Sequence, residues 1–231
     1  PSDGFGRIDA GNAILSKYKL TDAERIQLRL RTDQDDLTQY FYLRRNIVKA
    51  KIPALAQGSK DFYAVDIHAT AFATDDTKQQ HIDKYVETLA EIQSSGDYFV
   101  TGGDLNSVPP GSVTDFCLSD MCDGDDYHTD QAEEYHKEGS YFENFEGEPD
   151  ILDTLYQAYD AAIGSDDANL PIHLTHGPST SYEMNDIKYD RKLDYLFTNG
   201  IWENASSKTH QAAWELSDHL PVSAVFNVGG E

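Results

Sequence analysis

Residues 100–112 read VTGGDLNSVPPGS, an apolar strand pattern that runs into Gly-Gly-Asp-Leu-Asn and is ended by two prolines. Residues 82–92 before it have the spacing of an amphipathic helix, and residues 98–100 that of a short buried strand. Asp104 and Asn106 are therefore predicted at the carboxyl end of a central strand, where α/β proteins usually place their chemistry. Being two positions apart on an extended chain, they face the same side. Turn chemistry and a shared binding pocket are both compatible interpretations of this stretch.

The composition indicates a globular chain. Of 231 residues, 39% are hydrophobic and 11% aromatic, which is enough to bury a substantial core. Because no repeat and no linker divides the sequence, we expect a single domain over residues 1–231. No apolar run has the length of a membrane span, and the first residues do not resemble a signal peptide.

The charge is strongly negative and unevenly distributed. Against 18 Lys and Arg residues there are 41 Asp and Glu residues, a formal net charge of −23. Between Asp120 and Asp167 there are 16 acidic residues and one basic residue, Lys137, so this segment alone carries −15. Such a chain repels polyanions, which disfavours indiscriminate nucleic-acid binding. Most of these residues are expected to form a solvated surface that keeps the protein soluble. The same pattern suits saline or extracellular surroundings, which favours a secreted or periplasmic protein without fixing the compartment.

Two cysteines, Cys117 and Cys122, lie five positions apart. They either close a small disulfide loop in an oxidising compartment or are two unrelated thiols. A zinc site that adds His128 and His136 is less favoured, because these residues fit none of the usual zinc-ligand spacings.

Strand patterns recur at both ends of the chain, and the acidic middle contains a helical pattern at residues 150–163. This mixture favours an α/β fold whose sheets pack on each other. The strands are predicted at residues 12–18, 40–52, 61–70, 98–100, 191–199 and 218–228.

Polar residues mark several of these strands. A buried Asp such as Asp194 within KLDYLF costs several kcal/mol unless it is paired, and a His is its natural partner. Any one such residue is more often structural than catalytic. Their recurrence at strand ends indicates a common site, whose candidate members are His68, Asp104 with Asn106, Asp194, and Asp218 with His219.

Five segments together resemble motifs of the endonuclease/exonuclease/phosphatase superfamily, the deoxyribonuclease I-like metal-dependent phosphoesterases. The segments are GNAILSKYKL, VDIHAT, GGDLNS, RKLDYLF and LSDHLPVSAVF, in the family's order from Gly11 to Phe226. The resemblance implies two packed β-sheets flanked by helices, a four-layer α/β sandwich, with the site in a cleft at one edge of the sheets.

The resemblance also implies roles for the matched residues. Asp104 would orient and deprotonate the attacking water, and Asn106 would hold that water or a phosphate oxygen. His219 would bind the scissile phosphate, with Asp194 fixing its tautomer. His68 would sit across the cleft, binding phosphate or protonating the leaving oxygen. Such a set supplies the base and the positive charge that attack on a phosphate ester requires.

A divalent cation completes the implied site. Asp218 would be a metal ligand, and hard oxygen donors favour Mg²⁺, with Mn²⁺ as a possible substitute. The family's Asn motif and Gln-Glu motif, the latter carrying the principal metal-ligand carboxylate, should precede Gly11 by several tens of residues, but the chain starts at Pro1. We therefore expect a domain that is truncated at its N-terminus and lacks the first strands.

The expected function is divalent-metal-dependent hydrolysis of a phosphodiester or phosphomonoester by water attack. The alternatives are a sequence-indifferent nuclease and a catalytically silent phosphate-binding module, the latter because the Glu motif is absent. The charge favours a small phosphoester or phospholipid-like substrate, since the only basic cluster that could meet a nucleic-acid backbone is Arg44, Arg45 and Lys49.

Overall fold

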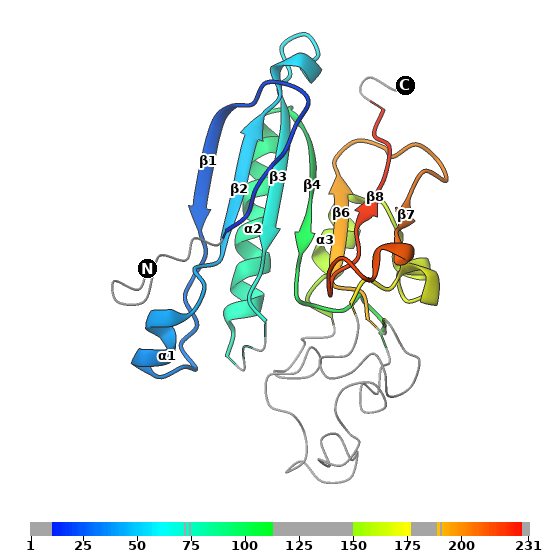
Figure 1. Ribbon diagram of the computed structural model, residues 1–231. Coiled ribbons are helices and arrows are strands. Elements are labelled where there is room, and N and C mark those ends of the chain that lie inside the picture. Colours follow the sequence, from blue (N-terminus) through cyan, green and yellow to red (C-terminus); the bar gives the residue numbers. More distant parts are fainter. Residues whose placement is uncertain are drawn as a thin grey trace.

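The computed structural model describes residues 11–71, 73, 75–112, 150–176, 189 and 191–227 (Figure 1). These residues form a six-stranded mixed sheet in the order β1-β2-β3-β4-β6-β5 and a two-stranded sheet of β7 and β8. The strands are β1 (Thr21–Gln27), β2 (Asn46–Lys51), β3 (Phe62–His68), β4 (Tyr98–Asp104), β5 (Asp160–Ala161), β6 (Asp194–Thr198), β7 (Lys208–Thr209) and β8 (Val222–Ser223).

The pairing of β4 brings three polar residues into one row. β4 runs parallel to β3, with His68 opposite Asp104, and antiparallel to β6, with Asp104 opposite Asp194. Paired residues on neighbouring strands point to the same face of a sheet. The three side chains therefore stand next to one another at the edge where β3 and β4 end.

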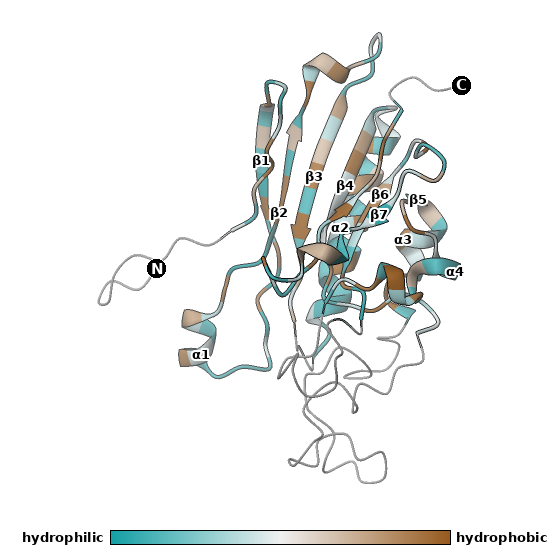
Figure 2. Cartoon of the chain, turned by 45° about the vertical axis from the view of Figure 1, so that its right-hand side comes forward, coloured by the Kyte–Doolittle hydropathy of each residue, from teal (hydrophilic) through white to brown (hydrophobic). Residues whose placement is uncertain are grey.

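The long helix α2 (Thr77–Ser94) covers the opposite face of the sheet (Figure 1). Val65 and Ile67 of β3 pack into the buried core with Tyr85 and Leu89 of the helix. Because side chains alternate along a strand, the residues between them, such as Asp66, face away from α2. The alternation is visible as brown and teal bands along the strands (Figure 2).

The other helices that the structure describes are short: α1 (Asp36–Phe41), α3 (Asp153–Ala158), α4 (Ser165–Ala168) and the 3-10 helices η1 (Pro53–Leu55), η5 (Pro171–His173) and η6 (Gln211–Ala213). None of the helices within the described part of the chain is both long and apolar enough to cross a membrane.

The predicted α/β class, with two sheets and flanking helices, is confirmed, although the second sheet is small. The strand predicted at residues 12–18 is wrong: these residues have no regular structure, and the side chain of Leu15 is 96% exposed. The first strand is instead β1, whose sequence TDAERIQ is too polar for a hydrophobicity pattern to predict a strand. Among the described residues β1 pairs only with β2, and such one-sided pairing tolerates polar side chains.

Other predicted elements have different bounds. The strand expected over residues 40–52 is shortened to β2, because residues 40 and 41 belong to α1. Asp35 caps this helix by accepting hydrogen bonds from the backbone N–H groups of Leu37 and Thr38. The helix expected over residues 150–163 is shortened to α3, followed by the short strand β5. The terminal strand is shortened to β8 plus an isolated bridge between Trp202 and Phe226. Cys117 and Cys122 lie outside the described residues.

Candidate functional site

The candidate site lies where β3 and β4 end and β6 begins. His68, Asp104 and Asp194 come from these three strands, and His219 comes from the loop before β8. His219 is bonded to Asp194, and its Nε2 lies 3.8 Å from Asp104 Oδ2. The structure therefore brings together four of the residues singled out by sequence, from segments up to 151 positions apart.

His219 and Asp194 form the expected pair. Nδ1 of His219 donates to Asp194 Oδ2 at 2.9 Å and lies 3.2 Å from Oδ1. Burial lowers the pKa of His219, but the hydrogen bond to Asp194 and the charges of Asp194, Asp104 and Asp218 outweigh it and raise the pKa to about 9. The ring is consequently an imidazolium at neutral pH.

Asp104 is held between two imidazoles. Its Oδ2 lies 3.2 Å from His68 Nε2 and 3.8 Å from His219 Nε2, while its Oδ1 accepts the backbone N–H of Asn106 at 2.8 Å. Burial raises the pKa of Asp104, but His68, His219 and the Asn106 N–H together hold it below its usual value. Asp104 is therefore an ionised carboxylate in a partly desolvated position.

Asn106 is buried, and its side-chain orientation is fixed. Its Nδ2 donates to the backbone oxygen of Ala69 at 3.1 Å and to Asp104 Oδ2 at 2.9 Å, which uses both amide hydrogens. Only Oδ1 remains, and it can only accept. A backbone φ of 47° places Asn106 in the left-handed region, where Asn is tolerated better than most residues. The amide can thus orient a water molecule but has no further N–H for a phosphate oxygen.

Gly103, which directly precedes Asp104, allows β4 to lie very close to β3. It has a φ of 140°, and a Cβ added there would lie 1.9 Å from the backbone oxygen of Ile67. Only glycine fits this approach of β4 to β3, so the GGD sequence is a packing requirement of the site.

Asp218 is exposed, as a ligand for a hydrated cation would be, and Ser217 Oγ lies 3.3 Å from its Oδ1. Two groups of side chains among the described residues have ligand atoms within 4.8 Å of one another: His176, Asp218 and His219, and Asp104, Asp194 and His219. Mg²⁺ is commonly held by one or two carboxylates plus waters. Asp218 supplies one carboxylate, the smallest number that such a site requires. The oxygens of Asp104 and Asp194 already accept hydrogen bonds.

Several neighbours of the site were not predicted from sequence. Lys192 is buried, and its Nζ donates to the backbone oxygen of Asp194 at 2.8 Å. Burial lowers the pKa of Lys192 to about 8, against the opposing charge of Asp194. Thr175 Oγ1 accepts the N–H groups of Leu193 and Asp194, which fixes the start of β6. No strand pattern surrounds Thr175, so only its contacts reveal it.

Two further neighbours carry ionisable side chains. His176 is buried, and its ring centroid lies 4.4 Å from that of His219. Asp66 lies two positions before His68 on the same face of β3, and burial raises its pKa, opposed by the charge of His68 and a hydrogen bond from Asn12. The alternation within VDIH was the available signal for Asp66.

Solved structures with similar folds share little sequence with this chain. The 3'-5' exonuclease NExo from Neisseria meningitidis superposes with a TM-score of 0.53 at 15% identity, over 92% of this chain and 73% of the other. An AP endonuclease from Archaeoglobus fulgidus gives 0.47 at 12% identity, over 91% and 72%. An endonuclease/exonuclease/phosphatase from Beutenbergia cavernae gives 0.46 at 14% identity, over 90% and 45%. At such identities the likeness to NExo supports the fold alone.

This chain spans 45% of the Beutenbergia cavernae protein and 60% of the human Nocturnin catalytic domain, another similar structure. No curated protein matches the sequence. The family comparison is decisive, because residues 2–219 match the Endonuclease/Exonuclease/phosphatase family, and this range contains every candidate site residue. The chain belongs to the Endonuclease/Exonuclease/phosphatase family.

Proposed function

We propose that this domain hydrolyses a phosphate ester by direct attack of water. The observation that carries the proposal is the contact of Asp104 with both His68 and His219, with His219 in turn held by Asp194. An acceptor for the water's proton and two imidazoles for the phosphate and the leaving oxygen then lie within one network.

His219 would bind the phosphate as an imidazolium. Its pKa of about 9 keeps it charged at neutral pH, and Asp194 fixes the ring with Nε2 available to the substrate. Negative charge grows on the phosphate oxygens as the water attacks, and the imidazolium stabilises that charge. Asp194 acts by positioning this ring and does not itself exchange protons with the substrate.

Asp104 would take one proton from the water, and Asn106 Oδ1 would accept a hydrogen bond from the water's other O–H. The water oxygen then bonds to phosphorus while the bond to the leaving oxygen breaks. His68 would give a proton to that oxygen. Its side chain is 41% exposed, against 14% for Asp104, so it has room to move from the carboxylate to the leaving group.

The family implies a divalent cation, and Asp218 is the carboxylate that would hold Mg²⁺, with Mn²⁺ as a substitute. A bound cation supplies positive charge to the phosphate oxygens. The neighbouring protein groups alone account for the ionised state of Asp104 and the protonated state of His219.

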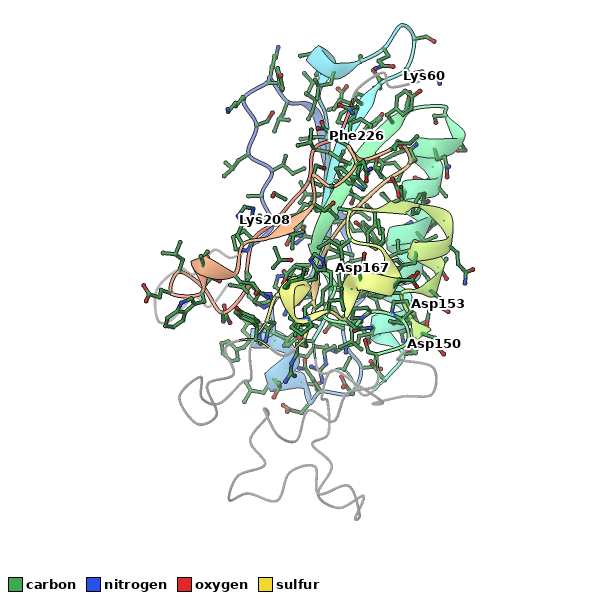
Figure 3. The ribbon with its side chains drawn as sticks, turned by 90° about the vertical axis from the view of Figure 1, so that its right-hand side faces the viewer. Lys60, Asp150, Asp153, Asp167, Lys208 and Phe226 are labelled. Carbon is green, nitrogen blue, oxygen red and sulfur yellow. The ribbon has the colours of Figure 1, made fainter. Side chains whose placement is uncertain are left out.

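The substrate that the charges favour is a small phosphoester or a phospholipid-like head group. Residues 150–176 contain five acidic residues and no Lys or Arg. Three of them, Asp150, Asp153 and Asp167, lie on one side of the molecule (Figure 3). Lys49, from the basic cluster, pairs with Glu24 at 3.0 Å and lies opposite Val65, on the face of the sheet turned away from His68. The five acidic residues of this segment repel a nucleic-acid backbone, and Lys49 is not placed to attract one to the His68 side of the sheet.

A sequence-indifferent nuclease is the second candidate. The similar fold of NExo, which is described as a 3'-5' exonuclease, favours it. Salt separates the two candidates: a nuclease that binds through the phosphate backbone loses affinity steeply as salt rises, whereas hydrolysis of a small ester is nearly indifferent.

The test is turnover of bis(4-nitrophenyl) phosphate and of plasmid DNA with Mg²⁺, for the wild type and the variants Asp104→Ala and His219→Ala. His210→Gln is the matched control, because His210 Nε2 bonds Ser223 Oγ outside the network. We expect both site variants to lose at least 100-fold in kcat/KM and the control to retain its rate. If the wild type binds phosphate but turns over substrate no faster than His219→Ala, the proposed hydrolysis is contradicted and the catalytically silent module is favoured.

A further inference from the structure

Two histidines and an aspartate gather beside the hydrolytic network. The ligand atoms of His176, Asp218 and His219 all lie within 4.8 Å of one another. His176 follows η5 in sequence, whereas the other two precede β8, so the fold brings together segments about 40 residues apart. His176 has no role in the proposed hydrolysis.

Backbone hydrogen bonds hold the two imidazoles together. His176 forms an isolated antiparallel bridge with His219 and a second one with Arg191. The N–H of Leu220 donates to the backbone oxygen of Thr175 at 2.8 Å, next to this pair. The two rings therefore meet as cross-strand neighbours, edge to face with an interplanar angle of 75°.

The hydrogen bonding of His219 suits a metal ligand. Its Nδ1 is bonded to Asp194, so Nε2 is the ring nitrogen that would coordinate an ion, and the ion displaces the Nε2 proton of the imidazolium when it binds. Histidines that bind metals usually donate their other N–H to a carboxylate or a carbonyl, which fixes the tautomer and raises ligand basicity. Asp194 already provides that partner.

The donor set determines the class of ion. Two imidazole nitrogens and one carboxylate oxygen suit Zn²⁺ and similar transition ions, whereas Mg²⁺ prefers oxygen donors alone. Two donors at about 2.1 Å from one ion lie at most about 4.2 Å apart. The three ligand atoms lie within 4.8 Å of one another, and the carboxylate of Asp218 is exposed and can rotate toward the ion.

We propose that His176, Asp218 and His219 form a binding site for a divalent transition-metal ion of the Zn²⁺ type, with water in the remaining position. An ion held there takes up both His219 and the carboxylate that would otherwise hold Mg²⁺. Zn²⁺ and Mg²⁺ consequently compete, and Zn²⁺ opposes hydrolysis.

Calorimetric titration with ZnCl₂ tests the site without any turnover, so its result is independent of the proposed hydrolysis. His176→Phe keeps an aromatic ring against His219 and removes the ligand nitrogen, and His210→Phe is the matched control. We expect His176→Phe to weaken zinc binding at one site at least tenfold and the control to leave it unchanged. The sequence also contains other possible zinc ligands, Cys117, Cys122, His128 and His136. The quantity compared is therefore the number of zinc sites that the variant loses relative to the wild type.

Asp218→Asn provides the second variant. Asp218 is exposed, so this substitution should not unfold the protein, which thermal unfolding followed by circular dichroism checks. We expect the same loss of zinc affinity, whereas His176→Phe should leave Mg²⁺ affinity within twofold of the wild type. Equal zinc affinity in the wild type and Asp218→Asn, or in the wild type and a folded His176→Phe, overturns the proposal.

Discussion

His81 is buried and His219 is partly buried, and the pKa values of these two histidines shift in opposite directions. His81 of α2 is 1% exposed; its Nδ1 accepts the N–H of Thr70 at 3.1 Å, and its Nε2 lies 2.7 Å from the backbone oxygen of Arg29. Burial lowers the pKa of His81, and the hydrogen bond to Arg29 only partly opposes this. His219 at the sheet edge has a carboxylate partner, and its pKa is raised to about 9.

The comparison shows that burial alone does not make a histidine a candidate for catalysis. Within the described part of the chain, His81 forms its hydrogen bonds with backbone groups. It stays neutral and connects α2 to Arg29, which precedes β2, and to Thr70, which follows β3. His219 is hydrogen-bonded to Asp194, whose negative charge keeps the ring protonated and so able to bind a phosphate. The hydrogen-bond partner, more than the degree of burial, therefore decides whether a histidine is neutral and structural or positively charged.

The largest expected effect is on rate. Asp194→Asn keeps an acceptor near His219 but removes the negative charge and favours the wrong tautomer, so we expect kcat to fall about 10²–10⁴-fold. Steady-state kinetics with a small phosphodiester measure it, alongside the denaturation midpoint. A rate within threefold of the wild type would show that the pair is structural, as His81 is.

His81→Phe should have the opposite profile. The buried N–H of Thr70 loses its acceptor, so the free energy of unfolding should fall by about 1–3 kcal/mol, as measured by urea denaturation. Hydrolysis by the folded fraction should stay near the wild-type rate, because His81 lies outside the site network. A rate loss comparable to that of Asp194→Asn would abolish the distinction between the two histidines.

Stability should depend on pH with opposite signs at the two histidines. The folded pKa of His219 lies above its unfolded value of about 6.5, so its contribution is complete below pH 6.5 and is lost as pH rises through about 9. The full pKa difference would correspond to about 3 kcal/mol, and solvent screening of the partly exposed ring reduces the loss to the order of 1 to 2 kcal/mol. Asp194→Asn should flatten it. The folded pKa of His81 lies below its unfolded value, so its contribution is present above pH 6.5 and is lost as pH falls below it. Urea denaturation from pH 5 to 9.5 measures both slopes.

The central strands and their polar ends could be predicted from sequence because alternation fixes which face each side chain occupies. Asp104 and Asn106 followed from their spacing, and the pairing of Asp194 followed from the cost of an unpaired buried carboxylate. β1 could not be found in this way, since its one-sided pairing leaves a polar sequence. His176 was also missed, because the backbone bridge that brings it to His219 joins distant segments without a strand pattern.

The orientation of Asn106 likewise needed the structure. Sequence allowed its amide to hold either a water or a phosphate oxygen, and only the hydrogen bonds to Ala69 and Asp104 show that Oδ1 alone remains. Such an assignment depends on counting donors and acceptors around one atom, which spacing along a chain does not encode.

The most direct test of the central claim is an NMR titration of the His219 ring, assigned by comparison with His219→Gln, in the wild type and in Asp194→Asn. The claim is that Asp194, aided by Asp104 and Asp218, keeps this partly buried imidazole positively charged for a phosphate. The predicted result is a pKa of about 9 in the wild type that falls toward 6.5 in Asp194→Asn. A wild-type His219 that titrates at or below 6.5, or a pKa that Asp194→Asn leaves unchanged, would contradict it.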